Sequence, residues 1–499
     1  MQHGIRTYEL SVSGAEGFVS AESQLLRHRH TVEQYGVQVE IPTNTRRVSH
    51  GSNPTIRLTH SLTHSLTHSL TRESCSHTKV MLSGPFRRAI GLSVRLNTLI
   101  SRVGSARMAI RAASSSAVPP GSSTAAVHAD ALADVDWMMT TDKDVSPPIS
   151  LSTTYTCPEE GSSGHIYSRI SNPTRDRAEF LLGAIESTPT EPAHAVLYAS
   201  GLAATFGVLA RLLPRRVAIS GGYHGTHLVL SQLQRISEGA HGASVPLPVP
   251  DEVASALRPG DLIWLETPRN PDCHVADVSA YVAAARAVGG IHVVVDATFA
   301  PPPLQRPLTL GADVVMHSTT KYLAGHSDAI GGALCVSDAA LATALKADRT
   351  ALGATPGSLE PWLLMRSLRT LHLRVTRQST TAAELCRWLH AAVDGSDASH
   401  PLRGLVKSVA HPSLPSDPAH EIARRQMSGG YGGCFALELS TEAAAKALPK
   451  ALLLFRDATS LGGVESLIEW RRKYDQKISP LLLRCSVGLW PVVSRSPST

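Results

Sequence analysis

The chain has 499 residues, of which 42% are hydrophobic and 18% are charged, and it carries a formal net charge of +6. This is the composition of a soluble protein with room for two or three domains, and no apolar run approaches the length of a membrane span, so a membrane protein is not expected. The seven cysteines are odd in number and lack C-x-x-C spacing, which argues for a reducing compartment and against a disulfide framework or a zinc site.

The positive charge belongs to the N-terminal part of the chain. Residues 1–125 contain 14 lysines and arginines and 6 acids, a net charge of +8, so the remainder carries −2. No basic helix or aromatic-interleaved patch recurs after this segment, and nucleic-acid binding is therefore not expected. We predict that residues 1–125 are a disordered, low-complexity basic extension that ends in a linker rich in Ser, Pro and Gly.

Within this extension, residues 58–70 repeat Leu-Thr-His-Ser without variation. Such a short unit matches no solenoid or coiled-coil period and buries no face in a helix or a strand. We interpret it as a translated simple repeat, with the functional start at Met81 or Met108, although its histidines also permit a metal site. Residues 81–111 hold six arginines and no acids, as a mitochondrial presequence does. The protein is expected in the cytoplasm, or in mitochondria if translation starts at Met81.

After the linker, a Tyr-Ser-Arg segment precedes Asn-Pro-Thr-Arg at residues 172–175. Tyr167 and Arg169 are two residues apart, so on an extended chain both side chains face the same way and can offer a phenol and a guanidinium to one phosphate. An exposed loop arginine is the alternative.

Predicted strands at residues 195–199 and 217–219 are each followed by a glycine-containing turn. Ser200, Gly201 and Leu202 lie where a helix begins, and backbone amides there can approach an anion at the positive end of the helix. A tight turn without a ligand fits equally well. Tyr223 follows the second strand and can stack on a flat ring, or pack in the core.

Two further predicted strands, at residues 261–266 and 290–296, each end in an acid. A carboxylate such as Asp296 can hold a pyridine nitrogen in its protonated form, so that the ring draws electrons from a bound substrate. Spacing alone also permits a helix N-cap at Asp296. Asn270 follows the first of these strands, in Glu-Thr-Pro-Arg-Asn-Pro.

A buried strand predicted at residues 312–316 leads into His-Ser-Thr-Thr-Lys. Lys321 therefore lies just past a strand end, where a lysine can form a Schiff base with an aldehyde, and Ser318 and Thr320 can turn their hydroxyls toward a phosphate. A solvated loop lysine is the alternative. Because parallel α/β sheets bind ligands outside the carboxyl ends of their strands, these polar residues at successive strand ends predict one site on a mostly parallel sheet.

Beyond residue 375 the pattern changes to amphipathic helices and short strands, which predicts a smaller C-terminal α/β domain. We therefore expect an arm at residues 126–176, a large domain at 177–375 and a small domain at 376–499. Ser460 begins Ser-Leu-Gly-Gly-Val-Glu-Ser-Leu, and Arg484 lies in Leu-Leu-Arg-Cys-Ser. A guanidinium can grip a substrate carboxylate with two parallel bonds, although a surface arginine is the alternative.

The string His-Ser-Thr-Thr-Lys-Tyr-Leu-Ala-Gly-His-Ser-Asp at residues 317–328 resembles the pyridoxal 5′-phosphate (PLP) attachment signature of the Cys/Met-metabolism enzymes, the family of cystathionine synthases and lyases. The other motifs resemble that family's Y-S-R-x-x-N-P-T-R, S-G-M-A-A, E-S-P-T-N-P, D-N-T-F-A and L-x-R-L-S-x-G. The likeness spans about residues 145–490 and implies a fold-type-I PLP-dependent transferase.

The resemblance also implies a role for each residue. Lys321, Tyr223 and Asp296 are the expected catalytic residues, which hold the aldehyde, stack on the ring and pair with its nitrogen. The resemblance implies further PLP contacts from Ser200, Gly201, Leu202, Ser318 and Thr320, and from Tyr167 and Arg169 of a neighbouring subunit. Arg484, Ser460 and Asn270 are expected to bind the amino-acid substrate, and no metal is expected.

The function that we expect is γ-replacement of the cystathionine γ-synthase kind, on an activated homoserine with cysteine, in a homodimer or a dimer of dimers. A cystathionine γ- or β-lyase and a PLP-binding homologue without turnover are the alternatives. Thr459 stands where γ-synthases and γ-lyases usually carry Glu, and Gly225 where methionine γ-lyases carry a reactive cysteine, which counts against that last activity.

Overall fold

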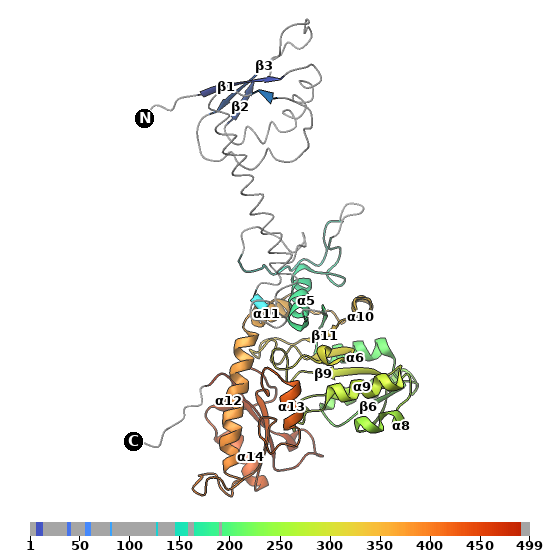
Figure 1. The fold of residues 1–499 in the computed structure, drawn as a ribbon, viewed down its shortest axis with the longest axis vertical. Coiled ribbons are helices and arrows are strands. Elements are labelled where there is room, and N and C mark those ends of the chain that lie inside the picture. Colours follow the sequence, from blue (N-terminus) through green and yellow to red (C-terminus); the bar gives the residue numbers. More distant parts are fainter. Residues whose placement is uncertain are drawn as a thin grey trace, which may run out of the picture. The chain divides into compact units, whose positions relative to one another are not determined.

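The computed structural model describes residues 126–127, 145–157, 164–188 and 192–490, together with the backbone of four short strands nearer the N-terminus (Figure 1). It separates into two compact units, Met1–Ala112 and Ala113–Thr499. Among the described residues, no helix is both long enough and apolar enough to cross a bilayer.

The unit Met1–Ala112 contributes a sheet in the order β2-β3-β1-β4. Its strands are β1 (Arg6–Val12), β2 (Val37–Glu40), β3 (Thr55–His60) and β4 (Val80–Met81). β3 takes in the first three residues of the Leu-Thr-His-Ser repeat. The rest of the repeat, most of the arginine-rich stretch and the linker lie outside the described residues, so the predicted nature of residues 1–125 stays a prediction.

A seven-stranded sheet forms the centre of the unit Ala113–Thr499, in the order β5-β11-β10-β9-β8-β6-β7. Its strands are β5 (His194–Tyr198), β6 (Arg216–Ile219), β7 (Ala243–Pro246), β8 (Leu262–Glu266), β9 (His292–Asp296), β10 (Val314–His317) and β11 (Gly332–Val336). The pairs from β10 to β7 are parallel, and β11 is antiparallel to both of its neighbours. The predicted mostly parallel α/β fold is confirmed, and the carboxyl ends of β8, β9 and β10 lie at one edge.

Helices cover both faces of this sheet, which explains why its central strands are almost continuously apolar. In β9, Val293 and Val295 pack in one core and Val294 in the other. The first core includes side chains from α5 (Pro173–Glu186), α9 (Val278–Val288) and α11 (Leu359–Leu368). The second includes side chains from α6 (Gly201–Leu212), α7 (His224–Ile236) and α10 (Ala339–Leu352). Short helices α8 (Val253–Ala256), η2 (Pro250–Glu252) and η3 (Pro307–Leu310) connect these elements.

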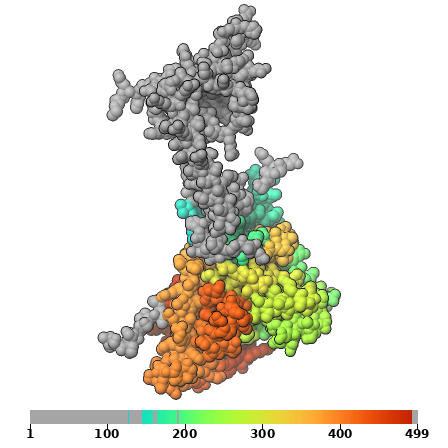
Figure 2. Space-filling model, viewed as in Figure 1, coloured from blue at the N-terminus to red at the C-terminus, as the bar shows by residue number. Residues whose placement is uncertain are grey.

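A second, five-stranded sheet has the order β12-β13-β16-β15-β14, with only β14 and β15 parallel. Its strands are β12 (Val406–Ala410), β13 (Cys434–Leu439), β14 (Phe455–Asp457), β15 (Ser466–Trp470) and β16 (Leu482–Ser486). The accompanying helices are α12 (Leu371–Ala391), α13 (His420–Gln426), α14 (Glu442–Ala451) and η4 (Arg471–Lys473). In Figures 1 and 2 this C-terminal part, orange to red, lies directly beside the green and yellow part that holds the large sheet.

Helix α12 joins the two sheets and runs across the predicted domain boundary at residue 375. Its first turns place Leu371 and Val375 in the core of the large sheet, while Ala382 and Cys386 pack in the core of the small one. Because one continuous helix contributes to both cores, the position of the boundary stays a prediction.

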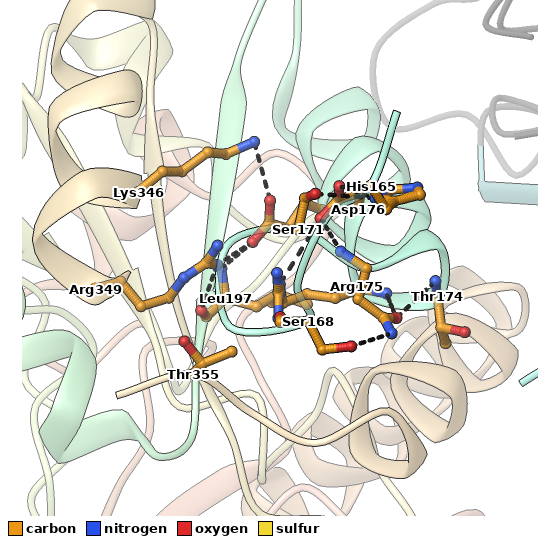
Figure 3. Close-up of polar contacts among 12 residues, drawn as sticks. His165, Ser168, Ser171, Thr174, Arg175, Asp176, Leu197, Lys346, Arg349 and Thr355 are labelled. Atoms are coloured by element: carbon orange, nitrogen blue, oxygen red, sulfur yellow. Dashed lines mark hydrogen bonds and ion pairs between the residues drawn. The ribbon is translucent and has the colours of Figure 1, made fainter. Parts of the chain in front are cut away.

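A buried polar network attaches the arm to the large sheet (Figure 3). Arg175, on α5, donates to the carbonyl of Ser168 over 2.7 Å. One turn further along α5, the Glu179 carboxylate pairs with Lys346 Nζ at 3.0 Å and closely with Arg349, both on α10, and accepts a 3.0 Å hydrogen bond from the backbone of β5. A buried carboxylate with this many partners fixes α5 and α10 against the same strand.

Replacing Glu179 by Gln is expected to destabilise the fold by about 3–5 kcal/mol at pH 7, because Arg349 is left as a buried charge without its counter-ion. Burial opposes ionisation, but Arg349 and Lys346 outweigh it and hold the pKa of Glu179 at about 2, below its ordinary 4.5. Stability from this depressed pKa is present above pH 4.5 and is lost as the pH falls toward 2.

The measurement is urea unfolding of wild type and variant at pH 7 and pH 3. The gap between the two proteins should narrow at the lower pH. Glu421→Gln, which removes one partner of an exposed ion pair with Arg424, is the matched control and should cost less than about 1 kcal/mol. Equal stabilities of the Glu179→Gln protein and wild type at pH 7 would contradict the assignment.

Candidate active site

Lys321 lies in the turn after β10, and its side chain reaches toward the small sheet. Its Nζ donates a 2.8 Å hydrogen bond to the hydroxyl of Ser460. Burial and the positive charge of Arg484 lower the pKa of Lys321 to about 8 from its ordinary 10.5. At pH 7 about a tenth of this amine is therefore unprotonated, far more than for an ordinary lysine, and this is the form that attacks an aldehyde or accepts a proton.

Two carboxylates end neighbouring parallel strands, Glu266 on β8 and Asp296 on β9, and they are register partners. Burial raises the pKa of Asp296 against hydrogen bonds from Thr298, whose backbone N–H lies 2.9 Å from Oδ1. Burial and the neighbouring Asp296 raise the pKa of Glu266 to about 8. Two adjacent buried acids are stabilised in their ionised form by a nearby positive charge, such as a protonated ring nitrogen of a ligand.

Glu266 also connects two turns of the site. Its Oε2 accepts a 2.7 Å hydrogen bond from the backbone N–H of Tyr223, and its Oε1 accepts another of 2.7 Å from that of Asn270. Gly222 has a φ of 85°, and a Cβ there would lie 2.4 Å from Oε2, so only glycine lets the carboxylate approach so closely. One side chain thus sets the positions of the predicted ring-stacking tyrosine and the predicted substrate-binding asparagine.

The start of α6 forms the predicted phosphate end. Ser200 caps the helix by accepting from the N–H of Ala203 at 3.1 Å, and the first N–H groups of a helix have no acceptor within it. A Cβ on Gly201 would lie 3.1 Å from the Ser318 side chain, so a glycine is what keeps this hydroxyl against the helix start. Leu202 follows as the second residue of the helix. The Thr320 hydroxyl, by contrast, bonds to both backbone groups of Gly331, at 3.0 and 3.2 Å.

Arg484, on β16, lies across from these strand ends and is buried. Its Nη1 donates to Asn270 Oδ1 at 3.1 Å, and its Nη2 donates to the carbonyl of Ser460 at 2.8 Å. Ser460 has a φ of 80°, a left-handed conformation that is costly for a residue with a side chain. Its hydroxyl and carbonyl thereby serve Lys321 and Arg484, so the structure brings all three predicted substrate-binding residues together beside the lysine.

Tyr167 and Arg169 lie together on the arm, with the guanidinium 5.2 Å from the centre of the Tyr167 ring. The hydroxyls of Thr350 and Thr355 donate to the Arg169 carbonyl at 3.5 and 3.3 Å. Within the described part of the chain, no hydrogen bond or ion pair joins either side chain to the residues around Lys321. Their expected contact with the PLP of a neighbouring subunit stays a prediction.

The side chains that surround Lys321 fit PLP. An amine of lowered pKa, a buried carboxylate pair, an exposed tyrosine and a helix start with a glycine lie along one sheet edge, and they suit an aldehyde, a pyridine nitrogen, a ring face and a phosphate in turn. The Gly201 contact is the most specific of these observations, because any larger residue would fill the space beside the helix start.

Comparisons with known proteins agree with this chemistry. The family model described as "Cys/Met metabolism PLP-dependent enzyme" matches residues 123–488. The chain is 40% identical over 332 residues to a cystathionine gamma-synthase of Mycobacterium tuberculosis, covering 65% of this chain and 81% of that protein. It is 37% identical over 361 residues to a cystathionine gamma-lyase of Dictyostelium discoideum, covering 68% and 88%. A crystal structure of cystathionine gamma synthase from Xanthomonas oryzae pv. oryzae, in complex with aminoacrylate and cysteine, superposes with a TM-score of 0.65 at 34% identity, covering 74% and 94%.

Fold, site and relatives define a PLP-dependent enzyme of sulfur amino-acid metabolism. The chain belongs to the Cys/Met-metabolism PLP-dependent enzyme family, and PLP is its cofactor.

The structure adds residues that the sequence reasoning did not place in the site. Glu266 was recognisable as an acid at a strand end, and its Glu-Thr-Pro-Arg-Asn-Pro motif was the signal that could have identified it. Glu469, which pairs with Arg484, and Arg471, which pairs with Glu469, also belong to the site, and no motif in the sequence indicated either of them. Beside the site, buried Glu186, His317 and Cys335 bring three potential metal-ligand atoms within 4.8 Å of one another, but His317 Nε2 and Glu186 Oε1 are 2.6 Å apart and form a hydrogen bond. The expectation of no metal stays a prediction.

Glu266→Gln is expected to weaken PLP binding about tenfold or more, because glutamine has one acceptor oxygen and must direct its NH₂ group at one of the two backbone N–H donors. Equilibrium dialysis of PLP against the cofactor-free protein measures this change. Glu266→Asp keeps both oxygens on a shorter chain and should fall between. Glu442→Gln, in an exposed pair with Lys446, should match wild type. A Glu266→Gln protein that binds PLP with wild-type affinity would show that the two hydrogen bonds of Glu266 are dispensable for binding.

Proposed function

We propose that this protein is a cystathionine γ-synthase-like enzyme that joins cysteine to an activated homoserine. The bond between Cγ and the leaving oxygen breaks, the oxygen departs with the electron pair, and the cysteine thiol loses its proton as the new S–Cγ bond forms. The observation that carries the proposal is the arrangement around Ser460, whose hydroxyl accepts from Lys321 and whose carbonyl accepts from Arg484. An amino acid held by its carboxylate at Arg484 would present its α-carbon to the lysine amine.

The residues around the α-carbon then have distinct tasks. PLP, when bound, withdraws electrons from that carbon. Lys321 removes the α-proton, and its lowered pKa of about 8 suits a base at neutral pH. Asp296 holds the ring nitrogen in its protonated form, and Tyr223, exposed at the start of α7, stacks on the ring and moves a proton to or from the leaving group or the incoming amine.

The phosphate and carboxylate ends orient the substrate. Ser200, Gly201, Leu202 and Ser318 are proposed for the phosphate. Thr320 is proposed as well, and its hydroxyl would exchange its bond to the Gly331 carbonyl for one to the phosphate. Arg484 and Asn270 are proposed for the α-carboxylate, with the asparagine oxygen fixing the guanidinium plane. A planar guanidinium binds a carboxylate in two-point fashion, which sets both position and rotation of the amino acid.

The arm supports an assembly with shared sites, a homodimer or a dimer of dimers. Tyr167 is 43% exposed and, with Arg169, lies on a segment that Arg175 fastens to α5. A phenol and a guanidinium held together on the surface suit a phosphate in a neighbouring subunit, as the family resemblance implies.

Cystathionine lyase activity is the second candidate, because relatives of similar identity include a γ-lyase and a β-lyase. Thr459, in place of the usual Glu, weakens the case for the synthase and for the lyase alike. Methionine γ-lyase activity is disfavoured by Gly225, since a Cβ there would lie 2.4 Å from the Tyr223 ring. A homologue without turnover is disfavoured because Lys321, Asp296 and Arg484 all remain in the described site.

The test uses the full chain and its Lys321→Ala variant, each incubated with an activated homoserine ester, with and without cysteine, and separately with cystathionine. Cystathionine that forms only when cysteine is present, and only with wild type, is the expected result. An oxo acid and ammonia formed from cystathionine would instead establish a lyase. A PLP-loaded wild type that converts neither substrate would overturn the proposal in favour of the non-catalytic alternative.

A further inference from the structure

Behind the proposed carboxylate site lies a row of three buried charged side chains. Glu469 Oε2 is 2.6 Å from Arg484 Nη2 and 3.0 Å from Arg471 Nη1. The side chains of Arg471, Glu469 and Arg484 are 8%, 3% and 5% exposed. Buried charges of this kind are retained only where partners compensate them, so the three form one electrostatic unit with a net charge of +1.

The local structure explains this arrangement. Glu469 and Arg484 are register partners on antiparallel β15 and β16, so their side chains lie on the same face of the small sheet. β15 ends at Trp470, and Arg471 starts the short helix η4. Its guanidinium donates to the carboxylate two residues earlier, over 3.0 Å.

Without Arg471, Glu469 would neutralise Arg484. Besides this carboxylate, Arg484 faces the Asn270 side-chain oxygen and the Ser460 carbonyl, which are both acceptors. Every group that positions the guanidinium therefore also reduces its attraction for an incoming carboxylate. Because Arg471 binds the same oxygen of Glu469, it restores one positive charge to the unit.

We propose that Arg471 is a positioning residue that acts through Glu469, leaving Arg484 with the net positive charge that binds the carboxylate of an α-amino-acid substrate. This inference rests on the proposed function, in which Arg484 receives that carboxylate. The same unit acts on Lys321. Burial and Arg484 lower the pKa of Lys321, whereas Cys434 and Glu469 raise it. Loss of Arg471 should therefore weaken carboxylate binding and also raise the pH at which Lys321 loses its proton.

The test measures binding of L-norvaline, which has no γ-leaving group, and of L-norvalinamide, which lacks the carboxylate, through the absorbance of PLP on the holoenzyme. Arg471→Met should reduce the preference for norvaline over norvalinamide about tenfold. An effect of this size is expected when a positive charge is lost on the other side of Glu469 from Arg484, in a partly desolvated site. Arg472→Met removes the same charge from the adjacent arginine, which bonds to the carbonyl of Ile478 and not to Glu469, and it should leave the preference unchanged.

Two further variants separate charge from packing. Arg471→Lys keeps the charge and should retain most of the preference. Arg471→Met combined with Glu469→Gln returns the unit to a charge of +1, so this double variant should recover the preference to within about threefold of wild type. A residue that only supports the fold would not be rescued by removal of a second charge.

A second readout uses the cofactor-free protein and needs no turnover. The pH dependence of reductive methylation of Lys321 by formaldehyde, followed by peptide mass spectrometry, gives the midpoint of its deprotonation. The midpoint should rise in Arg471→Met, and not in Arg472→Met.

The outcomes are distinct. Equal preference and equal midpoints in wild type and Arg471→Met would overturn the role of Arg471 while leaving the proposed function intact. An Arg471→Met defect that the double variant fails to reverse would also overturn it, as a packing effect. A wild type that does not distinguish norvaline from norvalinamide would overturn both the inference and the carboxylate site.

Discussion

The site depends on the contact between two sheets that Arg484 makes. Its guanidinium, on the small sheet, binds Asn270 at the end of a strand of the large sheet, while Ser460 connects it to Lys321. Each sheet by itself presents only some of the polar groups that we propose for PLP and the amino acid. Because α12 packs in the cores of both sheets, the distance between the halves is set by apolar burial, and the polar contacts refine it.

The ionisable side chains of the site lie in two buried groups. Glu266 and Asp296 place two buried carboxylates at adjacent strand ends, where burial makes their pKa values high. The second group holds Lys321, whose pKa is lowered by burial. It also holds Arg484, which pairs with the Glu469 carboxylate, as Arg471 does. Buried groups of opposite preference at short range are the usual means of tuning acids and bases near neutral pH. Backbone N–H donors to Glu266 and the two arginines that pair with Glu469 offset the free-energy cost of burying these carboxylates.

Outside the site, hydrogen bonds of polar side chains also hold the arm. Asn172 caps α5 and Arg175 binds the Ser168 carbonyl, so the segment with Tyr167 and Arg169 is held by two separate contacts. Glu179 anchors the other end of this network beneath β5. The contact with a neighbouring subunit that we propose for this surface would gain from the rigidity, because the side chains need not be ordered at the moment of association.

Local motifs made much of this protein predictable from its sequence. The polar residues at strand ends, from Ser200 to Lys321, could be placed in one site because parallel strands bring their carboxyl ends to one edge, and the family likeness named PLP. Those inferences needed only short-range patterns and the rule that ligands bind outside the carboxyl ends of parallel strands. The carboxylate-binding role expected for Arg484 required only the likeness of its motif.

Only the tertiary structure decided how these residues are held. The hydrogen bonds of Glu266, the left-handed Ser460 and the unit of Arg471, Glu469 and Arg484 join groups that are 2 to 139 residues apart in the chain. Such contacts follow from register between strands, such as Glu469 with Arg484, and from the turn that η4 makes after β15. Side-chain alternation predicts which face a strand residue occupies but not which charge lies opposite it, because partner choice is a property of the packed sheet.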